Sequence, residues 1–400
     1  MPQWSDYTTG ERVRFLRGQE MTQQGLANAT GLSLSLIQKV EQTSKASIGS
    51  LLRLASALKV DISVILGQQG PRHAMTMTDR AALRHIESAV HNSALKLFPD
   101  GMVPSDIPSL RAALGKASLH YWKGEHVETA SILPQLMMET TALADSGSGS
   151  ERDEAMRILA DAYRIAARVG NSLGSRNLSY AAMTHAKTSA ERASDELLYA
   201  AQNTTLAWVL MRDGRLADAI SLSLGAASQI EPSFSQNDQA RLAVYGKLMI
   251  RAAVASSRLE DKERARDYLS QAHAAAARVD GEIDPYETTF GQATAGTEAV
   301  TVALALGEIG KAIKLIKSTQ GVDQLRDVPR LRYMLSVALA QAEAKLWDRA
   351  ADTLLAVIAE RPEWARHQAL VGVVNQRIAD HATHKARQIS RTIGVPLALR

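Results

Sequence analysis

The sequence predicts an all-α protein in which a small N-terminal domain of five helices is joined to a long α-solenoid of helical hairpins. Aromatic residues make up only 4% of the 400 residues and alanine is abundant, which favours closely packed helices over sheets. From about residue 109 onward, nearly every stretch has the apolar spacing of a helix, interrupted by short turns. A chain of this length exceeds one hydrophobic core, so we expect at least two folded units.

Breaks in the helical pattern divide the chain into three parts, residues 1–68, 69–108 and 109–400. Residues 68–79 contain Gly70 and Pro71 and read as a linker. A connecting helix is expected over residues 79–97, and three prolines within residues 99–108 then form a second joint.

A turn motif recurs in the third part, with a helix followed by a glycine-containing turn, an aliphatic residue and an alanine. Residues 213–220 are the clearest copy, and residues 306–313 are another. The copies lie roughly 40–50 residues apart and resemble degenerate tetratricopeptide repeats, whose usual period is about 34 residues. We expect five or six stacked hairpins over residues 109–360, a flexible loop at 145–150 and a single capping helix over 362–381. A non-repeating helical domain remains an open alternative.

Two short helical segments joined by a tight turn are the clearest feature of the N-terminal domain. Thr22 and Ser33 each precede a segment and carry a side-chain oxygen that can cap its first turn. Gly31 lies between the segments, where a left-handed backbone is accessible to glycine at little cost. Ala27 is small where the two helices must cross closely, so the sequence predicts a helix-turn-helix.

This arrangement resembles the phage-repressor helix-turn-helix class (Cro-like, or XRE) over residues 11–67. The resemblance is carried by Thr22, Gln23, Leu26, Ala27, Gly31, Leu32, Ser33, Ile37, Glu41, Leu51, Leu54, Ala55, Leu58, Val60, Ile65 and Leu66. It implies that the third helix lies in the major groove of double-stranded DNA while the second crosses the backbone. The residues that the resemblance places at DNA are Gln23, Ser33, Leu34, Ser35, Gln38, Lys39, Thr43 and Lys45.

The chemistry of these side chains suits two roles. Gln38 can hydrogen-bond adenine, Lys39 can donate to guanine, and Leu34 can contact a thymine methyl group. Gln23 and Ser33 are expected at phosphates, which fix the register without reading the sequence.

Three further residues of this domain carry expectations. Leu34 and Leu36 are expected to point away from the buried face of the third helix, so that a DNA groove or a partner surface would cover them. Ordinary exposed leucines are the alternative. Glu41 is expected to be structural, because the resemblance implies that an arginine of the first helix, here Arg17, braces it.

The combination of such a domain with a tetratricopeptide-like array resembles a class of bacterial regulators, some of which bind a signalling peptide on the concave face. The resemblance implies a peptide or small-molecule effector. The residues expected to line its site are Tyr199, Asn203, Thr204, Trp208, Met211, Arg212, Arg332 and Leu335. Packing between hairpins is the alternative role for each. The segment Phe290-Gly291-Gln292 is also typical of regulators of this architecture, without an assigned chemical role.

Catalysis lacks support, because the sequence contains no nucleophile elbow, no phosphate-binding glycine loop and no metalloprotease motif. We expect no enzyme activity, no cofactor and no metal site. The absence of cysteine excludes disulfides and thiolate zinc sites. A cytoplasmic location without membrane contact is expected, since the first residues lack the apolar segment of a signal peptide and no apolar run reaches about 18 residues.

The sequence therefore predicts a sequence-specific DNA-binding transcription regulator. We expect a homodimer, assembled through the array, on a pseudo-palindromic operator, because one helix in one groove reads only a few bases. The alternative is an interaction adaptor whose array binds a partner protein and whose helix-turn-helix does not read DNA.

Overall fold

The computed structural model describes residues 7–18, 21–44, 46, 48–60, 62–66, 76–99, 101–233 and 237–393. Within these residues the regular structure is helical, apart from one isolated bridge between Ile283 and Phe290, which confirms the all-α prediction. Lys45 and most of the expected linker lie outside the described residues.

Five short helices form the N-terminal domain: α1 (Thr9–Arg17), α2 (Gln23–Thr30), α3 (Leu34–Thr43), α4 (Ile48–Ala57) and α5 (Ile62–Ile65). The expected caps are present, since Thr22 accepts a hydrogen bond from the Gly25 amide and Ser33 accepts one from the Leu36 amide. Gly31 ends α2 at φ 65°. The fully buried side chains of this domain are Val13, Leu26, Ile37, Val40, Leu54 and Ile65.

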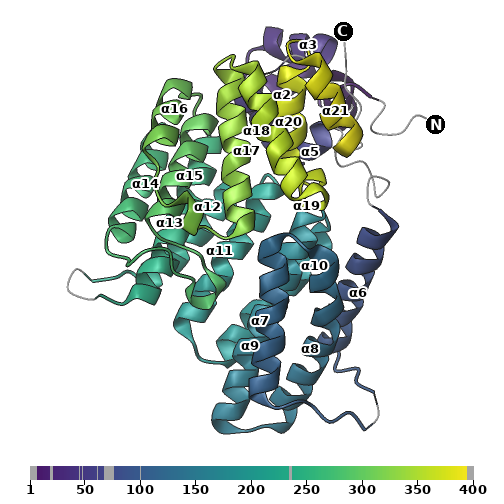
Figure 1. Cartoon of the computed structure of the whole chain (residues 1–400), viewed down its shortest axis with the longest axis vertical. Coiled ribbons are helices and arrows are strands. Elements are labelled where there is room, and N and C mark those ends of the chain that lie inside the picture. Colours follow the sequence, from purple (N-terminus) through teal and green to yellow (C-terminus); the bar gives the residue numbers. More distant parts are fainter. Residues whose placement is uncertain are drawn as a thin grey trace.

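Six helical hairpins follow in the array, in agreement with the expected five or six. They are α7 (Ile107–Lys123) with α8 (His126–Ser146), α9 (Gly149–Ser172) with α10 (Arg176–Arg192), α11 (Glu196–Arg212) with α12 (Leu216–Gln229), α13 (Gln239–Arg258) with α14 (Lys262–Ala276), α15 (Gln292–Ala305) with α16 (Ile309–Ser318), and α17 (Asp327–Glu343) with α18 (Trp347–Glu360). The first helices of successive hairpins also contact one another, which produces the solenoid in Figure 1. Two short 3₁₀ helices, η2 (Pro285–Glu287) and η3 (Val322–Gln324), lie in the connections on either side of the fifth hairpin.

The connecting helix α6 (Met77–Ala94) packs against α8 of the first hairpin. It begins earlier than expected because Thr76 and Asp79 form a capping box. Ser93 ties α6 to the array through buried hydroxyl contacts of 2.6 Å with Thr141 and 2.8 Å with Tyr163.

Two expectations about the array are wrong. The single capping helix over residues 362–381 is instead α19 (Pro362–Arg366) and α20 (Ala369–Ile378), and α21 (Thr383–Ile393) follows them. The expected loop at 145–150 is mostly helical, because α8 continues to Ser146 and α9 begins at Gly149.

The last hairpin and the C-terminal helices return to the first hairpin, so the solenoid closes on itself. Helix α17 contacts α7, and Arg361 Nε donates to the Lys123 carbonyl at 3.0 Å. Trp364 is buried against Gly124, where an added Cβ would lie 3.0 Å from the indole ring. Figure 1 shows α19 near the end of α7. Closure brings the first helices of the hairpins around a common interior, which the repeat pattern alone did not predict.

None of the helices in the described part of the chain combines the length and the apolar character needed to cross a membrane.

Candidate functional site

The outward face of α3 is polar and exposed. Ile37 and Val40 are fully buried on the inner face, whereas Ser35, Gln38 and Lys39 are exposed on the other side. Gln38 and Lys39 follow Ser35 by three and four positions, so the three side chains share one face of the helix as an exposed stripe. Three of the residues expected to contact bases thus share one accessible edge.

The remaining residues expected at DNA are placed as follows. Ser33 is exposed at the start of α3, and its hydroxyl lies 3.1 Å from that of Ser35. Thr43 is exposed at the end of α3, where its hydroxyl donates to the Lys39 carbonyl at 2.7 Å. Gln23 is half-buried, and its amide donates to Glu41 at 2.8 Å. A phosphate role for Gln23 would require it to share or release this partner.

The expectation that Leu34 and Leu36 are left exposed is wrong. Both are half-buried and pack against the hydrophobic core. Helical geometry explains the difference, because Leu34 precedes Ile37 by three residues and Leu36 precedes Val40 by four, so both flank the buried stripe. The positions of these two leucines therefore give no argument for DNA binding.

The expected brace on Glu41 is confirmed. Arg17 Nε donates to the Glu41 carboxylate at 2.8 Å, and the Glu41 side chain is only 4% exposed. Burial would raise the pKa of Glu41, but the hydrogen bonds from Arg17 and Gln23 outweigh it and lower that pKa. This network joins α1, α2 and α3 and fixes the orientation of the exposed stripe.

The N-terminal domain rests on the array through α4 and through Ala46. Ser56 of α4 donates to the Gly214 carbonyl at 3.3 Å, and Arg53 forms an ion pair with Glu260. From α20, Arg377 donates to the Ala46 carbonyl at 2.5 Å. The exposed stripe of α3 takes no part in these contacts, so the array does not cover it.

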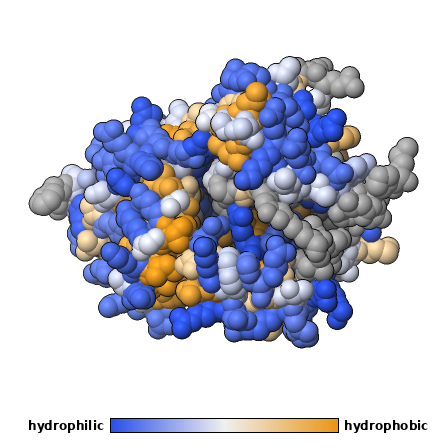
Figure 2. Space-filling view, turned by 90° about the horizontal axis from the view of Figure 1, so that it is seen from above, coloured by the Kyte–Doolittle hydropathy of each residue, from blue (hydrophilic) through white to orange (hydrophobic). Residues whose placement is uncertain are grey.

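A central cavity of about 320 Å³ lies where the N-terminal domain meets the array. Its walls come from the first helix of every hairpin and from α20. Leu52 and Ala55 of α4 and Ile62 of α5 also belong to the lining. Seen from above, the mostly hydrophilic surface has a hollow near its middle, with hydrophobic side chains gathered around it (Figure 2). The helix-turn-helix domain and the array thus share one cavity.

Six of the eight residues expected at an effector site line the central cavity: Thr204, Trp208, Met211, Arg212, Arg332 and Leu335. Tyr199 and Asn203 do not line it. Asn203 is buried and donates its amide to the Tyr199 carbonyl at 3.2 Å, away from the cavity. Successive residues of a helix are rotated by about 100°, so Asn203 faces a neighbouring helix where Thr204 faces the cavity.

Sequence reasoning missed several charged residues of the cavity. Lys247, Arg251 and Arg258 of α13, and Arg168 of α9, all line it. On α13 they are the charged positions of an otherwise apolar segment, at spacings of four and seven residues. Basic residues at helical spacing inside a buried stretch were the signal that could have identified them.

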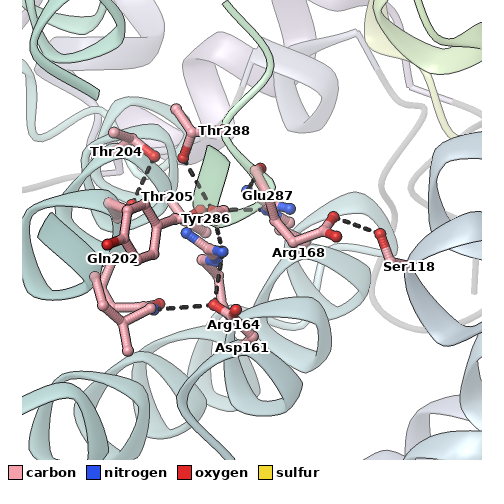
Figure 3. A network of polar contacts seen from close by, with 12 residues as sticks. Ser118, Asp161, Arg164, Arg168, Gln202, Thr204, Thr205, Tyr286, Glu287 and Thr288 are labelled. Carbon is pink, nitrogen blue, oxygen red and sulfur yellow. Dashed lines mark hydrogen bonds and ion pairs between the residues drawn. The ribbon is translucent and has the colours of Figure 1, made fainter. Parts of the chain in front are cut away.

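The connection between α14 and α15 crosses the interior of the array and reaches α7 and α9 (Figure 3). Tyr286 and Glu287 both have left-handed backbone conformations, at φ 49° and 54°, which are costly for residues other than glycine. Buried arginines hold them, since Arg164 donates to the Tyr286 carbonyl and Arg168 donates to the Glu287 carbonyl at 2.9 Å. This connection forms part of the cavity wall.

The segment at Phe290 has a structural role next to this wall, without lining the cavity itself. The backbones of Ile283 and Phe290 pair through two hydrogen bonds, and the fully buried Phe290 ring covers Gly246 of α13. A Cβ at Gly246 would lie 2.0 Å from the ring. Gly291 is needed for a similar reason, because its Cβ would lie 2.2 Å from the Gly281 carbonyl oxygen.

Several groups in the cavity have shifted pKa values, among them Glu287 and Lys247. Burial would raise the pKa of Glu287, but hydrogen bonds from Ser118 and Trp122, with the charge of Arg168, outweigh it and lower that pKa. Burial and the nearby charge of Arg251 lower the pKa of Lys247 to about 8.

In the described part of the chain, no group of three or more His, Asp or Glu side chains is placed to hold a metal ion.

Comparison with known proteins adds no relative: no protein-family model matches the chain, and no curated protein matches it in sequence.

Proposed function

We propose that this chain is a sequence-specific DNA-binding transcription regulator, without enzyme activity, whose helical array binds an effector in the central cavity. The exposed stripe of Ser35, Gln38 and Lys39 on a rigidly braced α3 is the observation that carries the proposal. The amide of Gln38 and the ammonium group of Lys39 are donors that match the edges of adenine and guanine in the major groove.

The shared cavity supports the regulatory half of the proposal. Because α4 and α5 contribute part of its wall, a molecule bound there contacts both the array and the helix-turn-helix domain. An effector with different affinities for the docked and released positions of this domain would shift its orientation. The proposed unit is a homodimer joined by the array, which would place two α3 helices on half-sites about 34 Å apart.

Selection of genomic DNA fragments by the purified full chain tests the DNA-binding half. We expect enrichment of a short, pseudo-palindromic sequence. The Gln38→Ala/Lys39→Ala double variant should lose at least 1–3 kcal/mol of operator affinity, on the order of 10-fold or more, by fluorescence anisotropy. Gln229→Ala/Lys314→Ala is the matched control, since both side chains are exposed and both lie on the array, outside the helix-turn-helix domain.

Absence of any enriched sequence would contradict the proposal. Equal affinity of the α3 variant and the control variant for every duplex would do so as well. In either case the array alone would have to account for the function, as an adaptor for partner proteins.

A further inference from the structure

Positive charge dominates the central cavity. Its basic residues are Arg168, Arg212, Lys247, Arg251, Arg258 and Arg332, whereas its acidic residues are Glu287 and Glu298. Glu287 is already engaged by the Trp122 indole at 2.9 Å and by Ser118. A cavity with low-dielectric walls and an excess of one charge attracts ligands of the opposite charge.

Lys247, Arg251 and Arg332 are cations without a carboxylate partner among the described residues. Within the described residues, no ion pair of 4.0 Å or less joins Lys247, Arg251 or Arg332 to an acidic side chain, although Glu298 is near enough to attract the first two. Arg251 donates to the Thr204 carbonyl at 3.1 Å, and Arg332 lies 4.7 Å above the Trp208 ring. The side chain of Lys247 has no hydrogen-bond partner among the described residues.

Another cavity residue, Arg168 of α9, has an unsatisfied donor. Arg168 is only 5% exposed, and its Nη1 has no hydrogen-bond partner within the described residues. Its other nitrogens are bound by Thr205 and by the Glu287 carbonyl, so the guanidinium is held in place. A buried donor without an acceptor is costly, and an anionic ligand would satisfy it.

The other lining residues indicate the body of the ligand. The rings of Trp122, Trp208 and Tyr333 line the cavity, beside several threonine side chains that include Thr205 and Thr297. A volume of about 320 Å³ is at the small end for ligand pockets, and therefore favours a small molecule over a peptide.

We propose that the central cavity binds a small organic anion, with an apolar or aromatic body between the tryptophan rings and its acidic group at Lys247, Arg251 and Arg332. The place of this anion as the effector rests on the proposed regulatory function. Binding itself does not, and can be measured without DNA.

A pair of probes that differ in charge tests the proposal, namely 2-naphthoate and the neutral 2-naphthamide. With the full chain, calorimetric titration should show 2-naphthoate binding at least about 10-fold more tightly, because charge-assisted hydrogen bonds form only with the carboxylate. Lys247→Met should weaken 2-naphthoate binding at least about 10-fold and leave 2-naphthamide binding unchanged. Lys314→Met, on the outer surface of α16, is the control and should change neither.

Arg332→Gln provides a second variant in case Lys247→Met does not fold, as judged by circular dichroism. Equal affinity for the two probes, no binding of 2-naphthoate at about 1 mM, or unchanged 2-naphthoate binding by the folded variant would overturn the proposal. A protein that binds 2-naphthoate but no DNA would refute the regulator alone. One that selects an operator but ignores 2-naphthoate would refute the anion site alone.

Discussion

Replacing Lys247 by methionine should stabilise the protein when the cavity is empty. The ammonium group lies among like charges, and burial with the charge of Arg251 lowers its pKa from 10.5 to about 8. Each pH unit between folded and unfolded pKa values corresponds to about 1.4 kcal/mol, so charged Lys247 costs the folded state about 3 kcal/mol at pH 7. Methionine has a similar length and carries no charge, so the variant avoids this cost.

The sign of the pH dependence follows from the lowered pKa. Below pH 8 the lysine is charged in both the folded and the unfolded protein, so the full cost is present. Between about pH 8 and pH 10.5 the folded protein releases this proton first, and the cost disappears. The advantage of Lys247→Met should therefore be largest at pH 7 and shrink toward pH 10.

Urea unfolding at pH 7 and pH 10, followed by circular dichroism, measures both effects. The control is Lys314→Met, which removes an exposed charge and should stay within about 0.5 kcal/mol of wild type at both pH values. A destabilised Lys247→Met variant at pH 7, or an advantage that does not shrink with rising pH, would refute the reasoning.

Three further predictions concern the wall, the brace and the cavity. Gly246→Ala should lower the free energy of unfolding by about 1–3 kcal/mol, because its methyl group would collide with Phe290. Gly225→Ala, which has open space around it, should be neutral or stabilising by up to about 1 kcal/mol in the same urea titration. Arg17→Met should leave the buried Glu41 carboxylate without its arginine partner, at a cost of about 3 kcal/mol, and speed hydrogen exchange of α3 amides. Arg84→Met, at an exposed position of α6, should do neither, and unchanged exchange in Arg17→Met would contradict the brace. Binding of 2-naphthoate at pH 8.5 should take up protons, because a nearby anion raises the pKa of Lys247, and titrations in buffers of different ionisation enthalpy would show this as a buffer-dependent heat.

The local features of the N-terminal domain were predictable from the sequence because they depend on neighbouring residues. The caps at Thr22 and Ser33, the turn at Gly31 and the buried pair Ile37 and Val40 all follow from helical spacing. The same spacing, applied to Leu34 and Leu36, would have placed them beside that pair rather than opposite it.

Long-range features of the array were not predictable in this way. Closure depends on Arg361 meeting Lys123 and on Trp364 meeting Gly124, which are more than 200 residues apart. Neither the repeat pattern nor the helix count determines the curvature of a solenoid. The cavity site was recovered on α11, where counting from Gly214 gave the inward face. It was missed on α9 and α13, because inward positions were counted only for the helices that became α11 and α17.

The most direct test of DNA reading by α3 is a coupling measurement between Gln38 and single base pairs of the selected operator. Gln38→Ala should cost about 1–3 kcal/mol on the operator and almost nothing on a duplex in which one A·T pair of each half-site is replaced. If the cost of Gln38→Ala is the same on every substituted duplex, α3 does not read bases and the proposed function is wrong.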